Sequence, residues 1–257
     1  MIHPTALIDP SAKVPASCSV GPYCIVGAEV QLGENCELIS HVVIHGPAKI
    51  GNHNRFFPFC TIGAEPQDIS YKGEKTRLEM GDGNVIRECV TLNRGTAKGG
   101  GVTCIGNQTL IMAYSHVGHD SVIDDHAMLI NGATLAGHVT VEPWAVVGAL
   151  CPVHQFVRIG AHAYIGGGTT ITQDVLPFSK CVEPRDVRAY GLNSVGLERR
   201  GFSKERIGRI QHAFRVLTNS RLNTTQALEK LKSEGDQGDD VRMLISFIET
   251  SERGVIK

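Results

Sequence analysis

The chain has 257 residues, of which 42% are hydrophobic and 20% charged, so it is expected to fold rather than to remain disordered. Its formal net charge of −1 gives no indication of binding to nucleic acid or to a membrane surface. The residues from Met1 to Pro4 lack the charged and apolar regions of a secretory signal, and no apolar run reaches the roughly 18 residues of a spanning helix. We therefore expect a cytoplasmic chain without stable membrane insertion.

Aliphatic or similar residues recur at every sixth position over most of the chain. The first series is Ile8, Val14, Val20, Val26, Leu32, Leu38, Ile44, Ile50, Phe56 and Ile62. The series resumes at Met80 and, after a shift of one residue, continues from Ile105 to Ile171. A period of six does not fit a helix or simple strand alternation, but it is typical of a solenoid with triangular coils of three short parallel strands. The aliphatic residue is position one of each hexad.

Position five of the hexads carries small residues, among them Cys18, Cys24, Cys36 and Cys60. The chain has eight cysteines and no C-x-x-C pair, and disulfides are rare in the cytosol. We therefore expect these cysteines to be buried filler rather than metal ligands or disulfide partners. Gly often stands at position two, as at Gly21, and we expect these glycines to serve tight corners.

Two segments, 67–79 and 94–103, interrupt the hexads, and the second contains three successive glycines. Long loops in a solenoid are usually functional, so we expect the second to cover the active cleft. A phosphate-binding loop is an alternative, although no G-K-[ST] signature follows. After Pro177 the hexads stop, and helical patterns appear at 204–214 after the capping residue Ser203, near 225–232 and near 240–249. The sequence predicts a parallel β-helix over 1–190 and a C-terminal helical domain over 191–257 that hides the terminal edge of the solenoid.

Histidines with a neighbouring carboxylate are the candidate catalytic residues. His119 falls at position three, where side chains leave the coil, and Asp120 beside it can fix the tautomer of a general base. Coils repeat every 18 residues, so His116, His138 and His154 can converge with this pair on neighbouring coils or across a subunit boundary. Such a cluster could instead bind zinc, as in a carbonic anhydrase of the same fold, and the spacing alone does not decide.

Longer motifs resemble those of the acyl carrier protein–UDP-N-acetylglucosamine O-acyltransferase family. They are the string His116-Val117-Gly118-His119-Asp120 and the segments 131–139, 153–156, 67–77, 87–96 and 191–203. The resemblance extends over nearly the whole chain and implies a left-handed parallel β-helix that forms a homotrimer. It also implies transfer of a 3-hydroxyacyl chain from acyl carrier protein to the glucosamine 3-hydroxyl of UDP-N-acetylglucosamine, the first step of lipid A biosynthesis, without a metal or another cofactor.

The resemblance implies that His119 is the general base, that Asp120 orients it and that the Gly137 N–H is the oxyanion donor. The implied contacts to the sugar, the phosphates and the uridine end are Asp68, His116, His138, His154, Gln155, Asn193, Arg199 and Arg200. Gly167 stands where the family limits acyl length, which implies a longer hydroxyacyl chain, although Gly166–Gly168 could equally serve corner geometry.

Two residues depart from the family pattern. Ser70 stands where a Lys is common, with Lys72 as a candidate replacement, and Val195 stands where an acidic residue is common. Basic residues outnumber acidic ones between Lys180 and Arg215, which suits docking of an acidic acyl carrier protein. Nucleic acid is the rival partner, but no aromatic residues are interleaved in the usual way.

Three other functions are considered. The sister UDP-3-acylglucosamine N-acyltransferase has an additional N-terminal uridine-binding domain, whereas hexads here are running by Ile8. A γ-class carbonic anhydrase-like metal enzyme leaves the 191–203 motif unexplained, and a non-catalytic scaffold gives the histidines no reason to converge. The sequence does not distinguish a 3-hydroxyl from a 3-amino sugar acceptor.

Overall fold

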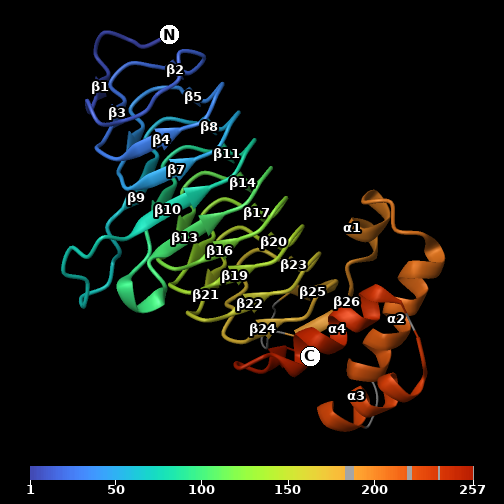
Figure 1. Ribbon diagram of the computed structural model, residues 1–257. Helices are drawn as coiled ribbons and strands as arrows, with labels where there is room; N and C mark the ends of the chain where they lie inside the picture. The colour runs from blue at the N-terminus through green and yellow to red at the C-terminus, as the bar shows by residue number, and fades with distance from the viewer. Residues whose placement is uncertain (183–187, 219–221, 237, 257) are drawn as a thin grey trace.

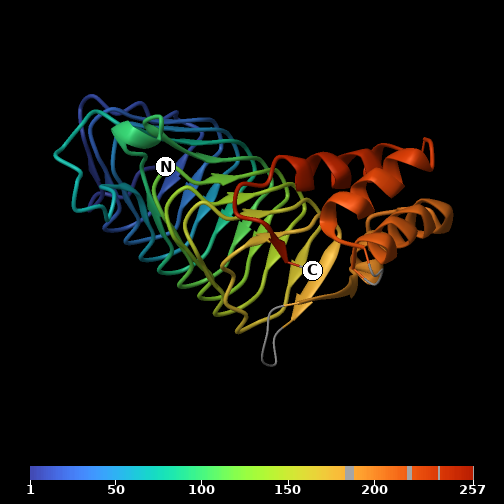
Figure 2. The same cartoon turned by 90° about the horizontal axis from the view of Figure 1, so that it is seen from below.

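A computed structural model describes residues 1–182, 188–218, 222–236 and 238–256. Three parallel sheets form the walls of a solenoid, and helices gather at one end of it (Figures 1 and 2). The chain passes from sheet 1 to sheet 2 to sheet 3 in each coil and then returns to sheet 1. Among the described residues, no helix is both long and apolar enough to cross a bilayer.

The strands of the three sheets are mostly two residues long. Sheet 1 contains β1 (Leu7–Ile8), β3 (Ile25–Val26), β6 (Val43–Ile44), β9 (Thr61–Ala64), β12 (Thr91–Asn93), β15 (His116–Val117), β18 (Thr134–Leu135) and β21 (Pro152–Val153). Sheet 2 contains β4 (Val30–Leu32), β7 (Ala48–Ile50), β10 (Arg77–Met80), β13 (Val102–Ile105), β16 (Val122–Ile123), β19 (Thr140–Val141), β22 (Arg158–Ile159), β24 (Asp174–Val175) and β27 (Val255–Ile256). Sheet 3 contains β2 (Ser19–Val20), β5 (Glu37–Leu38), β8 (Arg55–Phe56), β11 (Val85–Ile86), β14 (Leu110–Ile111), β17 (Met128–Leu129), β20 (Val146–Val147), β23 (Tyr164–Ile165), β25 (Ser179–Val182) and β26 (Arg188–Leu192).

The hexad aliphatics form the core because the register places each one beside its equivalent in the next coil. Val117 pairs with Leu135, and Leu135 pairs with Val153. These side chains are almost completely buried, as are the small residues at position five, including Cys36 and Cys60. Burial raises the pKa of the Cys60 thiol to about 12, and all eight cysteines are free thiols. The six buried cysteines therefore act as small apolar filler, whereas Cys89 and Cys104 are only partly buried.

The corners of the coils differ from the expectation based on glycine. Left-handed φ angles occur at position four, where Tyr23 and Asn35 each have φ of 57°. Gly21 at position two is needed for a different reason, because a Cβ atom there would lie 1.8 Å from the Ile39 carbonyl oxygen in the next coil. The prediction that position-two glycines serve tight corners is therefore wrong for Gly21, although Gly63 does have a positive φ.

Two loops leave the solenoid at the same corner, between sheet 1 and sheet 2. Residues 65–76 connect β9 to β10, and residues 94–101 connect β12 to β13 and include the 3-10 turn η1 (Ala97–Gly99). Figure 1 shows both loops projecting from one side of the solenoid. They overlap the predicted insertions 67–79 and 94–103, but strand structure already begins at Arg77 and Val102.

The C-terminal segment begins and ends on the solenoid. Its helices are α1 (Ser194–Arg199), α2 (Lys204–Thr218), α3 (Thr224–Ser233) and α4 (Asp239–Glu249). The proposed boundary at residue 190 falls within β26, which pairs antiparallel with β25, and β27 returns to the edge of sheet 2. The expected helix after Ser203 is longer than 204–214, and α1 was not expected. Residues 183–187 of the predicted basic segment lie outside the described residues.

Candidate active site

The catalytic candidates lie at the corner from which both loops project. Because successive coils stack in register, the position-three residues His119, Gly137 and Gln155 follow one another along this corner. The position-four residues Asp120 and His138 form a parallel column, and both have left-handed φ angles, of 60° and 62°. The solenoid itself therefore brings residues that are one coil apart in sequence next to each other.

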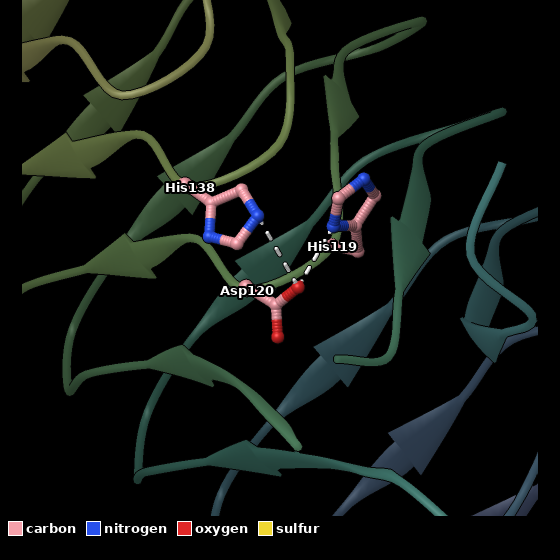
Figure 3. Close-up of side chains that lie close together, drawn as sticks. All are labelled: His119, Asp120 and His138. Atoms are coloured by element: carbon pink, nitrogen blue, oxygen red, sulfur yellow. Dashed lines mark hydrogen bonds and ion pairs between the residues drawn. The ribbon is translucent and has the colours of Figure 1, made fainter. Parts of the chain in front are cut away.

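Asp120 links two imidazole rings at this corner (Figure 3). His119 Nδ1 lies 2.8 Å from Asp120 Oδ2, and His138 Nε2 lies 3.7 Å from the same oxygen. The Asp120 side chain is fully buried, whereas the His119 side chain keeps 17% of its surface exposed. A carboxylate accepts hydrogen bonds, so the His119 proton resides on Nδ1 and the Nε2 lone pair is available to a substrate.

Gly137 lies directly against the His119 ring. A Cβ atom at Gly137 would be 2.5 Å from Cε1 and 2.7 Å from Nε2 of His119. Within the described part of the chain, the Gly137 N–H makes no hydrogen bond. An unbonded backbone donor beside a potential general base is the arrangement that stabilises an oxyanion.

The neighbouring histidines are held in their neutral form. Burial, and secondarily the charge of His119, lowers the pKa of His116, whose Nδ1 lies 2.8 Å from Thr91 Oγ1. Burial also lowers the pKa of His138 and outweighs the opposing effect of Asp120. His138 stacks on Phe156 with 4.4 Å between ring centroids. Neutral imidazoles can donate and accept hydrogen bonds, which suits contacts with sugar hydroxyls.

Asp68, on the 65–76 loop, faces the same corner. Ser70 donates to its carboxylate from both the backbone N–H, at 2.8 Å, and the hydroxyl, at 2.9 Å, and these bonds lower the pKa of Asp68. The charge of Lys98, and that of His119 when its ring is protonated, lowers it further. Lys98 Nζ donates to Ser70 Oγ at 3.1 Å. Lys98 therefore places a cation beside Ser70, whereas Lys72 as a replacement for the missing substrate contact stays a prediction.

His154 makes a different contact from the other candidate histidines. Its Nδ1 lies 2.6 Å from Nη2 of Arg253, just before β27, and 3.1 Å from the Gln155 carbonyl oxygen. Gln155 shares the corner column of His119, but Gly137 lies between them. These two residues thus border the cluster rather than belong to it.

The other predicted ligands lie at the two ends of α1, next to sheet 3. Asn193, Val195, Arg199 and Arg200 line a cavity of about 620 Å³ against the outer face of β17, β20 and β23. The Asn193 side chain accepts a hydrogen bond from the Gly196 N–H and donates to the His162 carbonyl oxygen, so both of its polar atoms are engaged. Within one chain, this cavity and the His119 corner are on different parts of the solenoid.

Gly167 stands on the corner between sheets 3 and 1. A Cβ atom there would meet the Ala149 carbonyl oxygen at 3.2 Å, a tight but adjustable contact, and its φ angle is not positive. Gly168 is the neighbour with the positive φ, of 75°. Corner geometry therefore accounts for Gly168 and does not require the absence of a side chain at Gly167.

A metal would compete with existing hydrogen bonds. His119, Asp120 and His138 place potential ligand atoms within 4.8 Å of one another. Asp120 Oδ2, however, already accepts hydrogen bonds from His119 Nδ1 and from Thr96 Oγ1, at 2.8 and 2.6 Å. A cation bound by this oxygen would have to displace both donors, so the arrangement favours proton transfer over metal binding.

Two threonines that were not among the predicted site residues hold Asp120 in place. Thr96, in the glycine-rich loop, donates to both carboxylate oxygens, and Thr103 Oγ1 accepts the Asp120 N–H at 2.8 Å. Both threonines are buried. The interruption of the hexads at 94–103 predicted a loop, and the family-like segment 87–96 ends at Thr96, but neither signal predicted the contacts with Asp120.

Comparisons with known proteins identify the family. The model of domain 2 of UDP-N-acetylglucosamine O-acyltransferase matches residues 174–256. An acyl-[acyl-carrier-protein]–UDP-N-acetylglucosamine O-acyltransferase from Stenotrophomonas maltophilia is 44% identical over 256 residues, covering 100% of this chain and 97% of that protein. The chain belongs to this O-acyltransferase family.

Solved structures of O-acyltransferase family members agree in fold over the whole chain. The UDP-N-acetylglucosamine acyltransferase of Francisella novicida has a TM-score of 0.97 at 40% identity, covering 100% of this chain and 94% of that one. The O-acyltransferase of Moraxella catarrhalis has a TM-score of 0.96 at 40% identity, covering 100% and 99%. The predicted left-handed parallel β-helix is confirmed. The comparisons do not favour the N-acyltransferase or the carbonic anhydrase alternative.

Proposed function

We propose that this chain transfers a 3-hydroxyacyl group from acyl carrier protein to the glucosamine 3-hydroxyl of UDP-N-acetylglucosamine, the first step of lipid A biosynthesis. The observation that supports the chemistry is the hydrogen bond from His119 Nδ1 to Asp120, which leaves Nε2 unprotonated beside the unbonded N–H of Gly137. Membership of the O-acyltransferase family supports the choice of substrates.

In the proposed reaction, His119 Nε2 removes the proton of the sugar 3-hydroxyl as its oxygen attacks the thioester carbon. Asp120 stabilises the imidazolium that forms. The Gly137 N–H donates to the oxygen that becomes negatively charged. Collapse of this intermediate breaks the carbon–sulfur bond, and the departing thiolate of acyl carrier protein receives the proton from His119. The products are an ester and a free thiol.

The proposed substrate contacts divide into two groups. Asp68, His116 and His138 surround the His119 corner and are suited to the sugar hydroxyls, with His154 and Gln155 further along the solenoid towards the phosphates. Asn193, Arg199 and Arg200 are proposed for the uridine diphosphate end and line a separate cavity on sheet 3. Because one chain does not bring both groups together, a homotrimer with each site shared between two chains is the proposed assembly.

Shape and charge support the proposed contacts with the acyl donor. The lack of a side chain at Gly167 supports acceptance of a longer hydroxyacyl chain, because no side chain projects from this corner. The basic segment 180–215 supports docking of an acidic carrier protein. Arg206 and Arg209 already pair with Asp240 and Glu205, at 2.5 and 2.9 Å, so the available charge is smaller than the sequence suggests. The proposed substrates also favour a cytoplasmic location.

The decisive experiment is transfer of radiolabelled 3-hydroxymyristoyl from acyl carrier protein to UDP-N-acetylglucosamine. Loss of a general base costs about 10²–10⁴ in rate, so His119→Ala should lose nearly all activity. His41→Ala is the matched control, because His41 is also a corner residue, and its ring lies between those of Tyr23 and Phe59 in another column. No transfer by the wild-type chain, with shorter donors and the 3-amino sugar also tested, would exclude the proposal, and zinc analysis would follow.

A further inference from the structure

The carboxylate of Asp120 accepts hydrogen bonds from Thr96 in addition to the one from His119. The Thr96 N–H donates to Oδ1 at 2.8 Å, and the Thr96 hydroxyl donates to Oδ2 at 2.6 Å. The Asp120 N–H in turn donates to Thr103 Oγ1 at 2.8 Å. All three contacts are buried, where hydrogen bonds to a charged group are strong and their loss is costly.

The hydrogen bonds from Thr96 determine whether Asp120 pairs with the His119 ring or with the His138 ring. Oδ2 lies 2.8 Å from His119 Nδ1 and 3.7 Å from His138 Nε2, so a modest rotation of the carboxylate would favour the wrong ring. Thr96 binds both oxygens and therefore fixes the plane of the carboxylate. Thr103 fixes the backbone of Asp120 at its left-handed φ of 60°.

The glycine-rich loop has the conformation needed to deliver Thr96. The Thr96 hydroxyl accepts the Gly99 N–H at 3.2 Å, and its carbonyl oxygen accepts the Gly101 N–H at 2.8 Å. Gly99 packs against the carboxylate so closely that a Cβ atom would lie 2.1 Å from Asp120 Cγ. Gly100 and Gly101 have positive φ angles, of 95° and 81°. The three glycines are thus explained by an approach to Asp120 rather than by phosphate binding.

We propose that Thr96 is a positioning residue, which holds Asp120 in the orientation that fixes the His119 tautomer, and that the 94–101 loop serves to place it. This inference rests on the proposed transferase function for its kinetic consequences. Its structural content, the Thr96–Asp120–His119 chain of hydrogen bonds, can be measured without substrate.

The kinetic test compares Thr96→Val and Thr96→Ser with wild type. Val keeps the shape and the backbone donor but removes the hydroxyl, so kcat should fall about ten-fold while KM changes less than about two-fold. Ser should restore most of kcat. Thr109→Val is the matched control. Thr109 lies directly before β14, and its buried hydroxyl donates to Asn84 Oδ1 at 2.8 Å rather than to Asp120.

The pH profile separates positioning from a purely structural role. Without the Thr96 hydroxyl, Asp120 can turn from His119 towards His138 and stabilise the His119 imidazolium less, so the acid limb of kcat/KM should move to lower pH. The titratable and charged groups that face His119 are Asp120, His138, His116 and Asp68, with Lys98 adjoining Asp68. Thr96→Val leaves all of them in place. An unmoved acid limb would overturn the proposal even if kcat fell.

Nuclear magnetic resonance provides the readout that does not depend on activity. The Nδ1–H proton of His119 should give a downfield signal, assigned by its absence in His119→Ala, and Thr96→Val should shift or broaden it while Thr109→Val does not. An unchanged signal in folded Thr96→Val would also overturn the proposal. An inactive wild-type chain in which Thr96→Val still shifts this signal would instead reject the transferase function and retain the positioning role.

Discussion

Replacement of Gly137 by Ala tests the contact between two neighbouring coils. The added Cβ atom would lie 2.5 Å from Cε1, 2.7 Å from Nε2 and 3.0 Å from Nδ1 of His119. Carbon atoms in ordinary contact are about 3.5 Å apart or more, so the ring has to retreat by about 1 Å. That movement breaks the 2.8 Å hydrogen bond to Asp120 or carries Nε2 away from the acceptor hydroxyl.

A displacement of about 1 Å at a catalytic group costs on the order of 10²-fold in rate, so kcat of Gly137→Ala should fall by about that factor. The substitution keeps the proposed oxyanion donor, because Ala has the same N–H. Gly137 does not have a positive φ, so the backbone tolerates Ala and the free energy of unfolding should change by less than about 1 kcal/mol.

The assay is acyl transfer under single-turnover conditions, with urea unfolding measured in parallel. Gly208→Ala is the control, because a Cβ atom at that position in α2 meets nothing within 4 Å. If folded Gly137→Ala kept kcat within three-fold of wild type, His119 would not need its observed position, and the assignment of the base would be refuted.

Three further predictions concern stability and metals. Gly21→Ala should lower the free energy of unfolding by about 3 kcal/mol, because its Cβ would lie 1.8 Å from a backbone oxygen; a urea midpoint equal to that of wild type would contradict this. Burial lowers the pKa of His162 to about 4, so this residue contributes stability that is present above about pH 6.5 and lost as pH falls towards 4. Between pH 7.5 and pH 5, the free energy of unfolding of His162→Phe should therefore fall less than that of wild type, by at most about 2 kcal/mol. Urea unfolding at the two pH values measures this difference, and equal losses in the two proteins would contradict the prediction. Dialysis against a chelator should leave transferase activity intact, whereas a loss that zinc restores would point to a metal at His119, Asp120 and His138.

The solenoid could be predicted because its signal is local and repeated. Each position-one aliphatic meets the equivalent residue of the next coil, so a six-residue period specifies the core directly, as for Val117 and Leu135. The proximity of Asp120 and His138 follows from the same repeat, since these residues are 18 positions, or one coil, apart. The sequence thus contains enough information to predict the coil and part of the cluster.

The remaining features depend on contacts that no period describes. The left-handed corners are occupied by ordinary residues such as Tyr23 and His41, so a search for glycine points to the wrong position. Thr96 reaches Asp120 from an irregular loop, and Lys98 reaches Ser70 from the same loop. Such contacts are set by the tertiary path of the 94–101 loop.

The return of β27 to sheet 2 has a consequence for the order of folding. Most coils need only a neighbour 18 residues away, as in the contact between Ser121 and Val139, so they can stack one after another as the chain is synthesised. Strand β24, in contrast, pairs with β27, which is synthesised much later, and Asp174 accepts a hydrogen bond from Ser251, 77 residues further along the chain. During that interval the solenoid presents an open edge to other nascent chains, which makes this the stage most vulnerable to aggregation.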